Sequence, residues 1–178
     1  MPQLLIRFSQ RLNELGAVLA ALVIASMFAL ILYEIMLRAV FSSSTYVLDE
    51  MVGYGVAAST FLGLGYALNQ GSLIRVNLVI SMIKSRTVRR VLEMLCVILV
   101  STINFLVLHS FGKSIARNFE RGAVSETIAE VPLWIPEGVL FIGLALFTLQ
   151  MLSYGLVILI NGPLIGEANK LPIQEQEG

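Results

Sequence analysis

The sequence has few residues that could carry chemistry. Its 178 residues include one cysteine and one histidine. The lone Cys96 cannot form an intramolecular disulfide, and it lies in an apolar run, where a small buried or lipid-facing side chain is the ordinary interpretation. One histidine and one cysteine cannot make a zinc site. No phosphate-binding loop, dinucleotide fingerprint or nucleophile elbow appears, so we expect neither a cofactor nor an enzyme.

Charge is scarce as well. Only 13% of the residues are charged, while 57% are hydrophobic; a soluble domain carries about 25% charged residues. A water-exposed surface cannot be built from so few charges, so the expected solvent is lipid. The formal net charge of zero gives no indication of nucleic-acid binding. We therefore predict an all-α membrane protein.

Four apolar stretches are long enough to cross the roughly 30 Å of hydrocarbon, which takes about 20 residues of helix. Continuous rather than alternating apolar runs favour helices over a barrel. The predicted spans are 15–33 (continuing as helix to about 41), 51–68, 94–108 (continuing to about 119) and 139–160. The last should stop at Asn161-Gly162-Pro163, since Gly accepts a left-handed conformation and Pro cannot extend a helix.

Two connecting segments are amphipathic. Residues 4–15 and 77–85 each place polar side chains on one helical face, as helices lying in the headgroup plane do. We predict short interfacial helices there, a strand-like or irregular loop being the alternative. Residues 1–163 are then one four-helix transmembrane domain, followed by a polar, mobile tail over 164–178.

The charges that flank the spans predict the orientation. With four spans both termini lie on one side, which receives eight of the twelve Lys and Arg residues, and the other side receives four. The positive-inside rule therefore predicts that both termini and the central loop are cytoplasmic.

Charged residues cluster where the first two spans meet. Glu34 and Arg38 lie four residues apart on one helical face, and the second span begins with Asp49 and Glu50. Because paired charges are cheaper near lipid than lone ones, we predict that Arg38 pairs with Glu34 and with Asp49 or Glu50. The alternative is that water solvates all four.

Small residues recur every fourth position in the first two spans. Helices in lipid associate by close packing, which small side chains permit, so these rows predict helix contacts, within the chain or with a partner; chance recurrence is the alternative. The rows are Ala21, Ala25 and Ala29, and then Gly55, Ser59, Gly63 and Ala67. In the third span, Asn104 is expected to hydrogen-bond another helix.

Three regions resemble the Q-type (DctQ-like) small membrane subunit of TRAP transporters, the tripartite ATP-independent periplasmic transporters. These are Leu48-Asp49-Glu50 with Phe61-Leu62-Gly63, the stretch from Ala67 through Arg75 and Asn77 to Arg90, and the segment 125–137. In that segment Pro132-Leu133-Trp134 matches the family's Pro-x-Trp, and Trp134 has the character of an interfacial anchor. Leu73 and Asn77 stand where the family commonly has His and Asp, which weakens the roles that the resemblance implies for those two side chains. Arg75, Asn77, Pro132 and Trp134 are candidate interface or structural residues.

The resemblance implies a sodium-coupled importer of an organic acid in the bacterial inner membrane. In such systems a large multi-span M-type subunit transports substrate delivered by a periplasmic binding protein, and the Q-type subunit scaffolds the large one. Helices one and two are then candidates for the large-subunit interface, and Arg117, Arg121 and Glu126 for the docking face. The alternatives are an accessory subunit of a tripartite tricarboxylate transporter and the membrane anchor of a redox complex.

Overall fold

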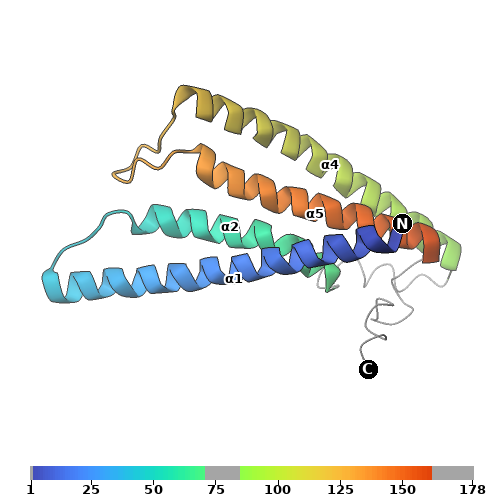
Figure 1. Ribbon diagram of the computed structural model, residues 1–178, viewed down its shortest axis with the longest axis horizontal. Helices are drawn as coiled ribbons and strands as arrows, with labels where there is room; N and C mark the ends of the chain where they lie inside the picture. Colours follow the sequence, from blue (N-terminus) through green and yellow to red (C-terminus); the bar gives the residue numbers. More distant parts are fainter. Residues whose placement is uncertain (1, 71–84, 162–178) are drawn as a thin grey trace.

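The computed structural model describes residues 2–70 and 85–161, and these form one elongated helical bundle (Figure 1). Four long helices make it up: α1 (Pro2–Phe41), α2 (Leu48–Asn69), α4 (Arg86–Arg121) and α5 (Trp134–Asn161). Each is long and apolar enough to cross a membrane, which confirms the predicted all-α membrane fold. The predicted tail, 164–178, lies outside the described residues.

The helices are longer than the apolar runs that predicted them. Residues 4–15 are the beginning of α1, which runs unbroken from Pro2 to Phe41, so the structure does not set them apart as a separate interfacial helix. The segment 77–84 lies outside the described residues. Helix α4 begins eight residues before the predicted span, because a helix need not stop where its side chains become too polar for hydrocarbon.

Helix α5 is the centre of the bundle. It packs against α1, α2 and α4, whereas α4 packs, among the described helices, on α5 alone. Half of the apolar span of α5 is buried inside the bundle, compared with 17% or less for the other three spans. In Figure 1 the α1–α2 pair and the α4–α5 pair diverge toward the end that carries residues 42–47 and 122–133, here called the loop end. The opposite end, with the N-terminus, is called the terminal end.

The connection at the loop end between α4 and α5 is ordered by backbone hydrogen bonds. Helix α4 stops at Gly122, whose φ of 58° is left-handed, and the Ala123 N–H donates to the Asn118 carbonyl at 3.0 Å, as in a Schellman cap. The chain then forms a short irregular hairpin in which the Ser125 N–H donates to the Val131 carbonyl at 2.9 Å and the Leu133 N–H to the Ala123 carbonyl at 3.0 Å. This loop hairpin, residues 122–133, stands beside the start of α2.

Candidate functional site

Polar side chains in this chain join helices and loops to one another. The clearest example is a group of four residues, here called the polar knot, made by Ser9 and Asn13 of α1, Asn69 of α2 and Gln150 of α5. The Gln150 side-chain oxygen accepts from the Ser9 hydroxyl at 2.7 Å and from the Asn13 amide at 2.9 Å. The Gln150 amide donates to the Asn69 oxygen at 3.4 Å. Ser9, Asn13 and Gln150 are all buried.

The polar knot was not anticipated from the sequence. Its visible signal in the sequence is an amide residue, Gln150, inside an uncharged and mostly apolar span. A buried amide surrounded by lipid-compatible side chains is unfavourable unless it is hydrogen-bonded. Its partners lie 81 to 141 residues away along the chain, so spacing alone could not name them. The knot fixes three helices at the terminal end.

A second tie joins α4 to α5. The Asn104 amide donates to the Leu144 carbonyl at 3.2 Å and also contacts the Thr148 hydroxyl. The predicted interhelix hydrogen bond of Asn104 is therefore present. Toward the loop end, the Glu137 carboxylate of α5 accepts from Ser114 and Asn118 of α4, each at 2.9 Å, so α4 is attached to α5 along most of its length.

The charged cluster at the loop end is organised around Glu34. This carboxylate is 1% exposed and pairs with Arg38 at 2.9 Å, which confirms that half of the prediction. Its other oxygen accepts from the Thr45 hydroxyl at 2.7 Å and the Thr45 N–H at 3.2 Å, and the Ser44 hydroxyl donates to the same oxygen that Arg38 contacts. Glu34 therefore holds the α1–α2 connection, in which Ser42 and Tyr46 adopt positive φ angles.

The predicted pairing of Arg38 with Asp49 or Glu50 is wrong. Arg38 instead donates to Ser44 at 3.2 Å, because the α1–α2 connection turns back onto Glu34 and occupies the space between. Glu50 accepts from Tyr54 one turn later at 2.8 Å and from Thr127 of the loop hairpin. The Glu50–Thr127 hydrogen bond bridges the two diverging helix pairs. Asp49 and Glu50 line a shallow groove there together with Tyr54, Ser125 and Glu126.

Glycines mark the closest helix contacts, although only some are in the predicted row. A methyl group added at Gly55 would lie 2.6 Å from Met27 Cγ of α1, whereas one added at Gly63 would meet nothing within 4 Å. The Ser59 hydroxyl bonds within its own helix, to the Val56 carbonyl at 3.1 Å. Three further close contacts lie outside the predicted row: Gly16 against the Leu62 carbonyl, Gly65 against Asn13, and Gly143 against the backbone of Phe61.

The remaining candidate residues lie at the loop end or outside the described residues. Trp134 stacks edge-on against Phe119 of α4, with ring centroids 5.7 Å apart, and Pro132 pairs with Val124 across the loop hairpin. Arg117 and Arg121 are exposed near the end of α4. Arg75 and Asn77 lie outside the described residues. Within 2–70 and 85–161, no group of three His, Cys, Asp or Glu side chains is placed to hold a metal ion.

Replacing Arg38 by Glu is expected to destabilise the loop end. A second carboxylate would then face the buried Glu34 and compete with it for the Ser44 hydroxyl. We expect a lower melting temperature in detergent, followed by the fluorescence of the single tryptophan, and a smaller effect than either glycine replacement described in the Discussion. Arg117→Glu, which reverses an exposed charge on α4, is the control; equal melting curves for the two variants would contradict the proposed role of Arg38.

The fold and its polar ties define a multi-pass helical membrane protein in which the buried hydrogen bonds join helices. Comparison with family profiles then gives a match to the DctQ component of the tripartite ATP-independent periplasmic transporters over residues 27–157, more than half of the chain. The chain belongs to this family, as the sequence resemblance predicted, and is a small membrane component of a transporter. No curated protein and no solved structure matches it.

Membership of the DctQ family indicates the general kinds of partner that the chain works with and the membrane in which it lies. DctQ components work with a large membrane subunit and a substrate-binding protein. Together with four membrane-spanning helices, this places the chain in the inner membrane as a multi-pass protein. The role of a transporter component, and not that of an enzyme, follows from the same match.

Proposed function

We propose that this chain is the stationary scaffold of a sodium-coupled, binding-protein-dependent importer of an organic acid, and that it holds the large M-type subunit in the bilayer. The family match over residues 27–157 is the observation that carries the proposal. The buried hydrogen bonds support a fixed role, because they join α1, α2 and α5 at the terminal end and α4 to α5 farther along. Hydrogen bonds of this kind hold the helices at fixed positions relative to one another, as a stationary subunit requires.

The outward face of α1 is the proposed surface for the large subunit. Ala21, Ala25 and Ala29 are all exposed on the bundle, while Gly55 of α2 is buried against α1. The row on α2 is thus partly used inside the chain, and the row on α1 remains available. Small residues let a neighbouring helix approach closely, and this is a main source of helix association in lipid.

The loop end is the proposed docking face for the binding protein. Both termini are then cytoplasmic, in agreement with the eight Lys and Arg on their side, and the loop hairpin is periplasmic. Glu126 lines the groove beside α2, and Arg117 and Arg121 are exposed at the end of α4. A face with charges of both signs suits a transient partner, since rim charges govern encounter rate and register more than affinity.

Affinity purification from native membranes tests the proposal. A tagged chain is expected to retain one large multi-span protein, and membrane vesicles holding both are expected to take up an organic acid delivered by the binding protein only under an inward sodium gradient. Ala25→Phe should lower the yield of the large subunit severalfold, because an aromatic ring prevents close helix approach. Leu152→Phe, which enlarges an exposed side chain on α5, should not. A chain that purifies alone and transports by itself would overturn the proposal.

A further inference from the structure

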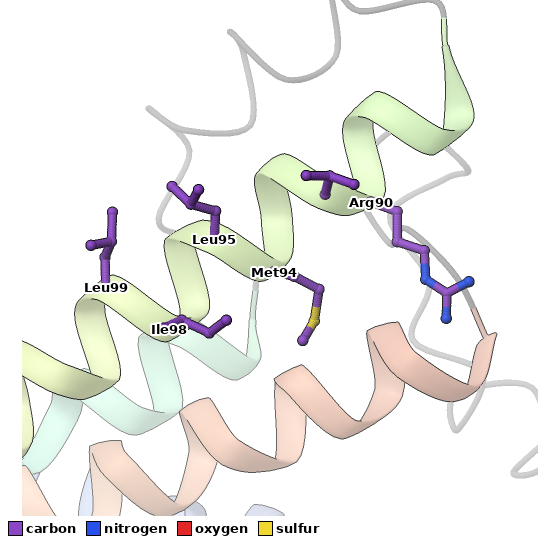
Figure 2. A pocket seen from close by; sticks show the side chains of 6 residues that line it. Arg90, Met94, Leu95, Ile98 and Leu99 are labelled. Carbon is purple, nitrogen blue, oxygen red and sulfur yellow. The ribbon is translucent and has the colours of Figure 1, made fainter.

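A shallow apolar groove follows the outward face of α4 at the terminal end of the bundle. Figure 2 shows Arg90 at one end of the groove and Leu99 at the other, with Leu95 and Leu99 pointing away from α5. Its wall consists of Arg90, Val91, Met94, Leu95, Ile98 and Leu99. Among the described residues that line the groove, Arg90 is therefore the one charged side chain, and the others are hydrocarbon or thioether side chains.

The position of Arg90 along α4 corresponds to the headgroup level of a bilayer. The next basic residue of this helix in the direction of the loop end is Lys113, 23 residues later, or about 34 Å at roughly 1.5 Å per residue. The hydrocarbon core is about 30 Å thick. The two cations thus flank one bilayer thickness, and the groove begins where lipid phosphates lie and continues into the hydrocarbon.

The length of the groove fits one leaflet. Leu99 follows Arg90 by nine residues, about 14 Å of helix, close to half of the roughly 30 Å core. At the mouth of the groove, Arg90 donates one hydrogen bond, from Nη2 to the Leu159 carbonyl of α5 at 2.6 Å. This bond holds the guanidinium at the end of α5 and uses one of its five N–H donors.

We propose that this groove binds one anionic phospholipid, with its phosphate on the Arg90 guanidinium and an acyl chain along Met94 and Ile98, which follow Arg90 by four and eight residues on the same side of the helix. The positive charge at the mouth and the apolar wall below it complement such a lipid at both ends. The inference goes beyond the proposed scaffold function, which requires no particular lipid. The lipid belongs to the leaflet at the terminal end, whichever side of the membrane that end occupies.

Native mass spectrometry of the full chain in mild detergent tests the site. The chain is titrated with phosphatidylglycerol and, separately, with zwitterionic phosphatidylcholine of the same acyl chains. We expect the chain to bind phosphatidylglycerol more tightly than phosphatidylcholine. Arg90→Gln should lower the affinity for phosphatidylglycerol about fivefold, which corresponds to the attraction of one cation near a membrane surface. The affinity for phosphatidylcholine should not change. Arg90→Lys should restore most of the difference. Arg117→Gln, at the other end of the same helix, should bind as the unaltered chain does.

Three outcomes of the lipid titration would overturn the lipid site. They are equal binding of the two lipids, an Arg90→Gln variant that keeps the preference, and an Arg117→Gln variant that loses it equally. A photoreactive benzophenone side chain at the exposed Ile98, used in intact membranes, distinguishes the occupant directly. We expect adducts of lipid mass; an adduct with another protein would show that a partner helix fills the groove instead. Neither readout depends on transport, so the scaffold proposal can fail while the lipid site stands.

Discussion

Replacing Gly143 by alanine is expected to lower the melting temperature by on the order of 10 °C. The added methyl group would lie 2.6 Å from the Phe61 carbonyl carbon and 2.9 Å from the Leu62 nitrogen. These are backbone atoms of α2 and cannot rotate away, so α2 and α5 must separate. Overpacking of this kind costs about 3 kcal/mol at the upper end of its usual range, which corresponds to that shift for a chain of this length.

Gly138→Ala is the matched control, because it makes the same chemical change in the same helix. A methyl group at Gly138 meets nothing within 4 Å, and alanine favours helix over glycine by up to about 1 kcal/mol. This variant should therefore melt at the same temperature as the unaltered chain or slightly above it. If both variants melt alike, the close α2–α5 approach is not a determinant of stability.

Gly65→Ala is expected to destabilise the bundle by about 2 kcal/mol, through the polar knot rather than the backbone. The new methyl group would lie 2.7 Å from Asn13 Cγ and closer still to the side-chain oxygen. Asn13 would have to turn, and its amide would lose the 2.9 Å hydrogen bond to Gln150. Breaking a buried hydrogen bond costs about 1–3 kcal/mol when a partner is left unsatisfied. Thermal melting in detergent measures the effect.

Two further variants separate this mechanism from a general intolerance of alanine in α2. Gly63→Ala, two residues away, points into open space and should have little effect. In an Asn13→Ala background the obstacle is gone, so Gly65→Ala should then cost much less than it does alone. Residues in contact couple in this way, whereas independent sites add. Strict additivity of Asn13→Ala and Gly65→Ala would refute the contact.

The sequence was informative about the spans because membrane crossing is a property of continuous apolar length. The first and last helices therefore end at or next to the expected residues, Phe41 and Asn161. The apolar run predicts a later start for α4 than the structure shows, since Arg86, Arg89 and Arg90 are unsuited to hydrocarbon but fully compatible with helix. The length of an apolar run indicates which residues can contact lipid, and not where a helix begins. This difference explains why α4 begins eight residues before the predicted span.

The side-chain contacts were harder to predict because they depend on helix rotation and on distant segments. Gly63 and Gly65 are two residues apart and therefore point in nearly opposite directions on a helix, yet only packing decides which one faces α1. Glu34 and Arg38 could be paired from their spacing of four residues. The partner of Glu50 could not, because Thr127 lies 77 residues away in a hairpin whose position depends on α5.

The central position of α5 has a consequence for biosynthesis. Helix α4 contacts, within the described bundle, only α5, and Gln150 of α5 is the common partner of Ser9 and Asn13. The ribosome completes α5 last of the four. Until that helix emerges, the nascent α1–α2 hairpin carries a hydroxyl and an amide without their final acceptor, and α4 has no neighbour from its own chain. The insertion machinery must therefore shelter three unfinished segments at once, and assembly of the bundle is completed after translation of its last span.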